Sequence, residues 1–414
     1  MKDKEKKPSE LAAQSASVNG VVDDTSQTHY SITLSDMQSI YGEVNGDKDN
    51  KKLKNKSWAK KKSSSELLRS SYFRISMTYK KLSDAGYSPK EIEEQFGILP
   101  SLGQRGLLVG TCGDVLQFRK PISGGKWKLH KASFCHDRLC PICTWRRSLK
   151  IYTQLNQIMN YLQPANYEYL FLTVTVPNCE GSELESVCDR ILKSFTKMMR
   201  RKELKSLVKG YFRSLEVTFN HNPWSKSFMT FHPHLHAILA VPKSYFKKSY
   251  IKQEDWLRMW REAYGDEGIE FVNIKKVYAS VSEEEKNEVA DEVSVALRKA
   301  IAEVGKYTVK SSDYLFSKDP VLTDHAVKWL AKALRSKKLF AMGGIFAEAA
   351  KALSLEDVMS SSSDLLHINA DDVINPELAY FVVRFKWGGS LYQAASFSVI
   401  DPVGSDSVPG EHIG

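Results

Sequence analysis

The stretch FHPHLHAILAV, residues Phe231–Val241, places three histidines directly before an apolar run. Alternation along a β-strand puts His232, His234 and His236 on one face and most of the apolar side chains on the other. One face is therefore predicted to join the core and the other to form a site. Imidazole is the commonest protein ligand for divalent metals, and side chains two residues apart on a strand lie about 7 Å apart at their Cα atoms. The alternative is a polar strand face whose histidines only form hydrogen bonds.

The composition limits what these histidines can mean. A chain of 414 residues with 42% hydrophobic content can bury a large core in two or three domains. The net charge of +10 and the 11% aromatic content favour nucleic acid over a membrane as the partner. The sequence shows no run of eighteen apolar residues and no hydrophobic signal core, so we expect a cytoplasmic protein. In that reducing compartment, six cysteines are more typical of metal ligands or buried residues than of disulfides.

Four cysteines have spacing that predicts a structural zinc site. The sequence CHDRLCPIC at residues 135–143 contains a Cys-x-x-Cys pair with a third cysteine five residues earlier and a fourth upstream. The four candidate ligands are Cys112, Cys135, Cys140 and Cys143. His130 or His136 could replace Cys112 as the fourth ligand, and buried free cysteines are the alternative interpretation.

Two basic segments are candidates for DNA contacts. One follows the cysteines directly, and the other ends a helix predicted over residues 183–209. A solvated helix face is the ordinary alternative for both segments. The predicted DNA-binding residues are Arg146, Arg147, Lys150, Arg200 and Arg201.

Two further strands are predicted beside the histidine strand. Tyr169–Val176 is rich in β-branched and aromatic residues and is predicted to be buried on both faces. Tyr211–Asn220 is followed by a turn at residues 221–224, so it can pair antiparallel with the histidine strand. Glu216 would then lie on the histidine face as an oxygen ligand, whereas an exposed strand glutamate is the alternative.

A long helix after Glu283–Glu285 is predicted to carry reactive side chains beside a core stripe. Glu303, Tyr307 and Lys310 fall at positions i, i+4 and i+7, which places a carboxylate, a phenol and an ammonium along one line. A phenol with a pKa near 10 is a poor nucleophile at neutral pH unless a cation or base favours its oxyanion, and Lys310 would supply that cation. Together with the histidine strand, these residues complete the groups needed for metal-assisted phosphoryl transfer. The core stripe is Val293, Leu297, Ile301, Val304 and Thr308.

These motifs resemble those of the HUH endonucleases. The resemblance rests on His-Leu-His in an apolar strand, the earlier FLTVTVPN segment at residues 171–178, and Glu-x-x-x-Tyr-x-x-Lys at residues 303–310. The chain is most similar to the rolling-circle replication initiator (Rep) proteins of small bacterial plasmids, in the single-tyrosine group with an upstream glutamate. The resemblance spans roughly Leu107 to Gly344 and includes the segments RLCPIC, FRSLEVT and SDY.

The resemblance implies an α+β fold, with a ferredoxin-like antiparallel sheet flanked by helices and a Cys-rich zinc-binding element upstream. It implies that His234 and His236 bind Mn²⁺ or Mg²⁺ on the open sheet face, that Tyr307 attacks the scissile phosphate, and that Glu303 activates the water that ends replication. Glu216 as third ligand is implied by related HUH enzymes with a carboxylate on the neighbouring strand. His232 also fits the motif, without a defined role.

The implied function is initiation of plasmid rolling-circle replication. Such a protein binds the double-strand origin, nicks one strand to give a 5′-phosphotyrosine and a free 3′-OH primer, and later rejoins the strand. A host helicase and a host DNA polymerase are partners implied by the family. Two rivals stay open: a transposase or mobilisation relaxase that uses the same residues on different DNA, and a zinc-dependent DNA-binding regulator without catalysis.

The predicted domain organisation has five parts. Residues 1–60 form a disordered polar and basic tail, 61–105 a helical segment, 106–150 the Cys-rich DNA-contacting element, and 151–323 the nicking-closing domain. Residues 324–414 form a helical and strand region with a hairpin predicted at residues 380–399. For this last part, origin binding and purely structural packing are both open.

Overall fold

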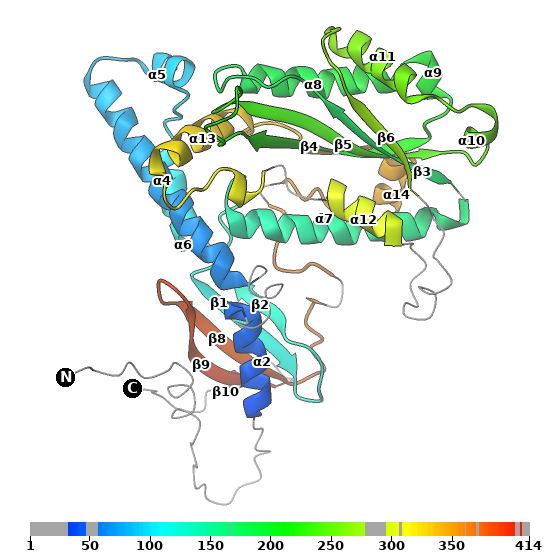
Figure 1. The fold of residues 1–414 in the computed structure, drawn as a ribbon. Coiled ribbons are helices and arrows are strands. Elements are labelled where there is room, and N and C mark those ends of the chain that lie inside the picture. The colour runs from blue at the N-terminus through cyan, green and yellow to red at the C-terminus, as the bar shows by residue number, and fades with distance from the viewer. Residues whose placement is uncertain are drawn as a thin grey trace, which may run out of the picture. The chain divides into compact units, whose positions relative to one another are not determined.

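The computed structural model describes residues 32–46, 57–165, 167–277, 295–305, 309–360, 362–369, 372–401 and 406–407. The chain forms two compact units (Figure 1). The large unit combines residues 61–116 and 131–374, and the small unit combines residues 1–60, 117–130 and 375–414. The small unit is therefore assembled from three separate segments of the sequence.

The large unit is organised around an antiparallel sheet with the strand order β6-β3-β5-β4-β7. Its strands are β3 (Glu168–Thr175), β4 (Gly210–Phe219), β5 (Phe231–Val241), β6 (Val272–Val277) and β7 (Phe340–Gly344). Helix α8 (Leu184–Met199) lies between β3 and β4 in the chain, and helix α11 (Gln253–Tyr264) lies between β5 and β6. This βαββαβ sequence of elements is the ferredoxin-like arrangement. The predicted α+β fold is confirmed.

The predicted hairpin of β4 and β5 forms the centre of this sheet. The two strands pair antiparallel along their lengths, with Glu216 opposite His234 and Ser214 opposite His236. On its other edge β5 pairs with β3, where Thr173 lies opposite His236. Cross-strand neighbours share a face of the sheet, so these residues line one face together.

The strand β3 is not buried on both faces as predicted. Leu170, Leu172 and Val174 are fully buried on one face, while Phe171 and Thr173 on the histidine face are only half-buried. This alternation is typical of an antiparallel strand with one face in the core.

Helices cover both faces of the sheet (Figure 1). On one face lie α8 and α11, where Phe195 of α8 packs against Tyr211 with ring centroids 5.2 Å apart. On the other face lie α7 (Pro141–Leu162), α12 (Val295–Val304) and α14 (Ile345–Ala352). Phe346 of α14 packs there against Tyr169 of β3. Within α12, the predicted core residues Leu297, Ile301 and Val304 are buried.

The other helices are shorter or lie outside these layers. Ser88 caps α5, because its side chain and Glu91 form a reciprocal capping box, with Pro89 at the first helical position. The helices outside the two layers are α4 (Trp58–Asp84), α5 (Pro89–Phe96), α6 (Leu102–Thr111), α9 (Lys202–Lys205), α10 (Tyr245–Lys248) and α13 (Pro320–Ala333), with the 3₁₀ turns η1 (Gln163–Ala165) and η3 (Ser311–Asp313).

Two predicted helices end earlier than expected. The helix predicted over residues 183–209 stops at Met199, and Arg200 and Arg201 separate it from α9. The helix predicted to carry Glu303, Tyr307 and Lys310 ends at Val304, and Lys310 is extended at the start of η3. Tyr307 lies outside the described residues. The prediction that one continuous helix carries both Glu303 and Lys310 is therefore wrong.

The division at residue 324 also differs from the one in the structure. Strand β7 adds to the edge of the central sheet by pairing with β4, with Phe340 opposite Ser214. Residues up to 374 accordingly belong to the large unit, and the predicted Cys-rich element at 106–150 is interrupted by residues 117–130 of the small unit.

The small unit contains most of a second sheet with the order β10-β9-β8-β1-β2. Its strands are β1 (Val115–Pro121), β2 (Lys128–Ala132), β8 (Tyr380–Trp387), β9 (Tyr392–Ile400) and β10 (Asp406–Ser407), beside helix α2 (Leu34–Asn45). Strands β8 and β9 form the predicted C-terminal hairpin. Asn45 at the end of α2 exchanges two hydrogen bonds with the backbone of Tyr392, and Phe118 packs against Phe385.

Across the described ranges, no helix combines the length and the apolar character needed to cross a membrane.

Candidate functional site

Glu216, His234 and His236 converge on one point of the central sheet. The Nε2 atoms of His234 and His236 lie 3.6 and 3.2 Å from the same Oε2 atom of Glu216. One candidate ligand atom from each residue falls within 4.8 Å of the others. The register of β4 and β5 produces this convergence, because Glu216 is directly opposite His234 and diagonal to His236. His232 is not part of the group; its ring centroid is 5.4 Å from that of His234.

The second nitrogen of each histidine has its own partner. His234 Nδ1 lies 3.2 Å from the backbone carbonyl oxygen of His232, and His236 Nδ1 lies 2.9 Å from the hydroxyl of Thr173. A carbonyl only accepts, so His234 donates from Nδ1 in this contact, and its Nε2 faces Glu216. A neutral imidazole with its proton on Nδ1 offers the Nε2 lone pair as a ligand for a divalent metal. These residues therefore fit a divalent metal, with Thr173 and the His232 carbonyl orienting the two rings.

Lys310 completes the charge balance of this cluster. Its Nζ lies 3.1 Å from Oε1 of Glu216, while 47% of its side chain remains exposed. Burial alone would raise the pKa of the Glu216 carboxyl, but the contacts with His234, His236 and Lys310 outweigh it and hold that pKa well below its usual value. The carboxylate is thus ionised and available as a ligand. Burial lowers the pKa of Lys310, yet Glu216 more than compensates and leaves it raised.

Glu303 and Tyr307 were predicted beside this cluster. Glu303 is half-buried on α12, which packs on β5 and β4. Its charge contributes to the raised pKa of Lys310, after the larger effects of burial, Glu216 and Asp313. Tyr307 lies outside the described residues, three positions before Lys310 in the sequence.

The four predicted cysteines form a second cluster, in the large unit. Cys112 Sγ lies 3.6 Å from the Sγ atoms of Cys140 and Cys143, and Cys135 Sγ lies 3.7 Å from that of Cys143. A tetrahedral zinc ion with bonds of about 2.3 Å places its sulfur ligands about 3.8 Å apart, whereas a disulfide needs about 2 Å. The geometry therefore fits one tetrahedral ion. It also selects Cys112 over His130 or His136 as the fourth ligand.

The protonation of the cysteines is consistent with a cation site. Burial alone would raise the pKa of Cys140, but the thiols of Cys112, Cys135 and Cys143 lower it well below its ordinary value. Burial raises the pKa of Cys143. A metal ion at this position would bind the four sulfur atoms as thiolates.

Comparison with known proteins identifies the family. Residues 126–392 match a family model described as replication protein. The chain is 34% identical over 290 residues to "Protein rep" of Bacillus amyloliquefaciens, covering 68% of this chain and 81% of that protein. It is also 36% identical over 267 residues to "Protein rep" of a Bacillus species, covering 62% of this chain and 83% of that protein.

The chain belongs to the plasmid rolling-circle replication initiator family. A "Protein rep" of Staphylococcus aureus is 37% identical over 218 residues, which cover 52% of this initiator and 86% of the relative. No solved structure matches the chain.

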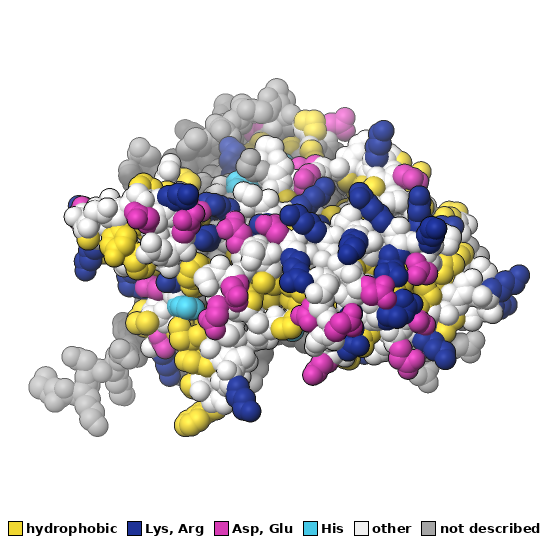
Figure 2. Space-filling view, turned by 90° about the horizontal axis from the view of Figure 1, so that it is seen from above, with side chains coloured by type: hydrophobic (Ala, Val, Ile, Leu, Met, Phe, Trp, Pro, Cys, Tyr) yellow, Lys and Arg dark blue, Asp and Glu magenta, His cyan; other side chains and the backbone are white. Residues whose placement is uncertain are grey.

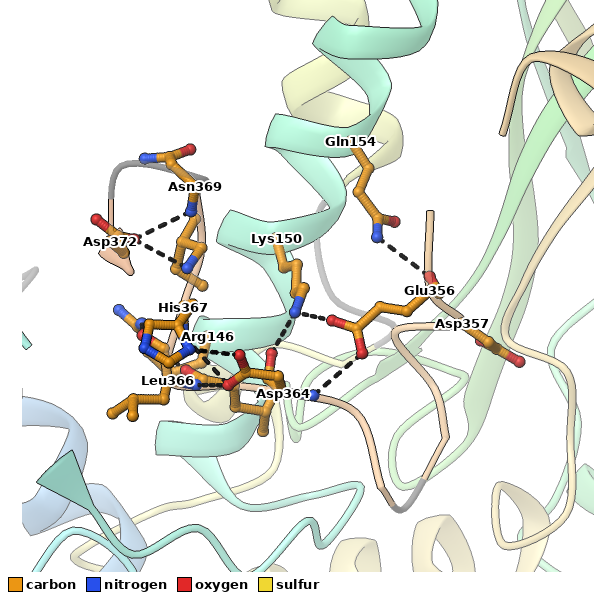
Figure 3. Close-up of polar contacts among 12 residues, drawn as sticks. Arg146, Lys150, Gln154, Glu356, Asp357, Asp364, Leu366, His367, Asn369 and Asp372 are labelled. Atoms are coloured by element: carbon orange, nitrogen blue, oxygen red, sulfur yellow. Dashed lines mark hydrogen bonds and ion pairs between the residues drawn. The ribbon is translucent and has the colours of Figure 1, made fainter. Parts of the chain in front are cut away.

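The first predicted DNA-binding segment of the initiator faces inward. Arg146 donates to the carbonyl oxygens of Leu365 and Leu366, and Lys150 contacts Glu356 and the carbonyl of Asp364 (Figure 3). These contacts fasten residues 356–369 to α7. Arg146 and Lys150 are buried, and burial lowers the pKa of both, to about 10 for Arg146.

Arg147 is also buried and donates to the carbonyl oxygens of His136 and Asp137. With Arg146 and Lys150 it forms part of the internal packing, so the expectation of a basic surface at the start of α7 is not met. Arg201 pairs with Glu203 and Glu262, while Arg200 is exposed.

Two features of the site were missed from the sequence. Thr173 was not singled out, although its place in the predicted strand allowed it to face the histidines once the register was known. The contact between Lys310 and Glu216 was missed because it depends on where α12 ends. In both cases the missing information is the tertiary register rather than the residue type.

Proposed function

We propose that this initiator starts replication with a site-specific nick in one strand of plasmid origin DNA. In the proposed reaction, the phenol oxygen of Tyr307 attacks the scissile phosphate, forms a 5′-phosphotyrosine and releases a free 3′-OH. The observation that carries the proposal is the convergence of His234 and His236 on the Glu216 carboxylate, with Lys310 on its other oxygen. Ferredoxin-like topology and membership of the initiator family support it.

Glu216, His234 and His236 would hold Mn²⁺ or Mg²⁺. When bound there, such an ion neutralises charge on the phosphate oxygens. Carboxylate oxygens suit these hard cations, and the buried position of Glu216 keeps competing water away from one side of the site. Cys112, Cys135, Cys140 and Cys143 would hold a structural Zn²⁺.

The chain's own residues account for the handling of the nucleophile. Tyr307 lies three positions before Lys310 in the sequence, and a chain spans at most about 3.6 Å per residue, so the contact of Lys310 with Glu216 would keep the nucleophile within reach of the cluster. The ammonium of Lys310 would stabilise the phenolate as the phenol proton leaves.

A second carboxylate would serve the last step of replication. Glu303 would act as the general base for a water molecule, which would cleave the strand once a full circle has been copied. Glu303 is only half-buried on α12, so water can reach its side chain. The free 3′-OH would be extended by a host DNA polymerase on a template opened by a host helicase.

A labelled oligonucleotide tests this proposal. We expect the wild-type protein with Mn²⁺ to cleave a single-stranded origin oligonucleotide and to retain the label in a covalent protein–DNA band. Tyr307→Phe removes only the hydroxyl and should abolish the band while retaining DNA binding. DNA binding without any adduct in the wild-type protein would instead support a non-catalytic regulator.

A further inference from the structure

A basic groove lies over the opposite side of the central sheet from the histidines. It has a volume of about 560 Å³ and is open to solvent. Its lining residues are Leu192, Lys193, Thr196, Lys197, Arg200, Arg213 and Lys338. Figure 2 looks onto the α8 side of the sheet, where Lys and Arg side chains gather with acidic side chains among them. The groove itself is lined by five cations and no carboxylate.

The strand register places the groove and the histidine cluster on different faces. Ser214 pairs with His236 on the histidine face, and the adjacent Arg213 pairs with Ala237. Successive side chains on a strand point to opposite faces, so Arg213 points toward the α8 layer. A ligand in the groove therefore does not compete with one at the histidine cluster.

Arg213 forms the buried end of the groove. Only 6% of the residue is exposed, and its guanidinium donates to the carbonyl oxygens of Lys338 and Leu339. Within the described part of the chain, no carboxylate comes within ion-pair distance of it. Burial lowers the pKa of Arg213 to about 10. A buried cation without an anionic partner is costly, and an anion in the groove would remove that cost.

The outer wall is a row of two lysines on α8 and the arginine that caps its C-terminus. Lys193, Lys197 and Arg200 stand at positions i, i+4 and i+7 and therefore share one helix face. The helix dipole favours cations near the C-terminus of α8, where Lys197 and Arg200 lie, and Lys193 one turn earlier adds a third positive charge to the same wall of the groove. The row extends about 10 Å along the helix axis, which equals the axial rise of about three nucleotides of B-DNA at 3.4 Å each.

The lining favours a phosphate backbone over an acidic peptide. A helical peptide binds a groove through apolar anchors, and Leu192 is the single aliphatic residue in this lining. Cations and a hydroxyl, by contrast, are the groups that contact DNA phosphates.

We propose that this groove binds the phosphate backbone of duplex DNA flanking the nick site, while the histidine face acts on the single strand. The inference rests on the proposed nicking function, because it divides one DNA substrate between the two faces of the sheet. The groove holds the duplex without reading its bases, since its contacts are to phosphates.

Duplex binding and single-strand cleavage, measured separately, test the proposal. The variant is Lys193→Ala/Lys197→Ala/Lys338→Ala, and the matched control is Lys243→Ala/Lys247→Ala/Lys248→Ala, which removes three exposed lysines outside the groove. The affinity for a labelled origin duplex is measured over a series of salt concentrations. Cleavage of a single-stranded origin oligonucleotide is measured with the same proteins.

We expect the groove variant to bind the duplex at least tenfold more weakly than wild type. The slope of log affinity against log salt concentration should become shallower by about 2.7, because each of the three lost phosphate contacts contributes about 0.9. Its cleavage of the single-stranded oligonucleotide should stay within about twofold of wild type, and the control should keep the wild-type slope. The proposal would be overturned if the groove variant kept the wild-type salt slope, or if the control variant lost as much duplex affinity as the groove variant. Absence of single-strand cleavage in the wild-type protein would instead refute the nicking function, and the duplex measurement would still be informative about the groove.

Discussion

The two metal-competent clusters differ in how completely the protein surrounds them. The cysteine cluster offers four sulfur ligands, three of them from buried residues, which is enough to enclose a tetrahedral ion. The Glu216–His234–His236 cluster offers three ligand atoms and has an exposed lysine at its edge. Structural sites are closed, whereas catalytic sites keep a position for substrate. The difference supports the proposed stabilising role of the first cluster, the closed one, and the proposed chemical role of the second, the open one.

The largest effect on activity is expected at the open cluster of Glu216, His234 and His236. Replacing His234 and His236 together by Ala removes two of three ligands, and we expect metal-dependent nicking to fall by more than about 100-fold, since loss of even an orienting partner costs about 10–100-fold. Denaturant unfolding should change little. The control is His232→Ala, which keeps the backbone carbonyl that orients His234. Equal losses in the double variant and the control would contradict the ligand assignment.

At the closed cluster of four cysteines, a substitution should reduce stability most. Cys140→Ser removes a buried ligand, and we expect it to lower the free energy of unfolding by about 4 kcal/mol or more, because metal binding is coupled to folding. Metal analysis and denaturant unfolding measure both consequences. Cys188→Ser is the control, because Cys188 is equally buried but lies outside the cluster. A wild-type protein purified without zinc would refute the structural zinc site.

A substitution of Glu303 tests whether this residue acts only in the terminating cleavage. Glu303→Ala should leave the first cleavage by Tyr307 unchanged and slow the terminating cleavage by about 100-fold or more, as for loss of a general base. In a cell this would produce replication products longer than one plasmid unit. Unit-length circles from a well-folded variant would exclude the proposed hydrolytic role and leave that of Tyr307 intact.

The smallest effect is expected from a substitution of Thr173, which orients the ring of His236. Thr173→Val keeps the side-chain shape and removes the hydroxyl that contacts His236, so we expect about tenfold weaker Mn²⁺ binding by calorimetry. Thr175→Val is the matched control, because that hydroxyl donates to the backbone of Phe271 instead. Equal Mn²⁺ affinities for the two variants would show that Thr173 does not orient the ligand.

Local sequence patterns predicted the parts of the site that depend on short-range geometry. Alternation placed His234 and His236 on one face, the turn residues after β4 indicated its antiparallel pairing with β5, and cysteine spacing predicted the thiol cluster, with the choice of Cys112 left to the structure. Each of these features is determined by residues close together in sequence or by the period of a strand.

Long-range contacts determined the features that the sequence did not reveal. The inward position of Arg146 depends on the carbonyls of Leu365 and Leu366, more than 200 residues further along the chain. Strand β7 joins the sheet through pairing with β4, which periodicity cannot reveal. A basic helix looks the same in sequence whether it packs against carbonyls, as α7 does, or lines an open groove, as α8 does.

Mapping the covalent adduct tests the central claim most directly. After reaction with the single-stranded origin oligonucleotide and Mn²⁺, nuclease trimming, proteolysis and mass spectrometry should find the nucleotide phosphate on Tyr307. The neighbouring Tyr314 is buried and donates its hydroxyl to the carbonyl of Leu139, so Tyr314→Phe should keep the adduct. A phosphorylated nucleotide on any other residue, or an adduct that persists in Tyr307→Phe, would contradict the account.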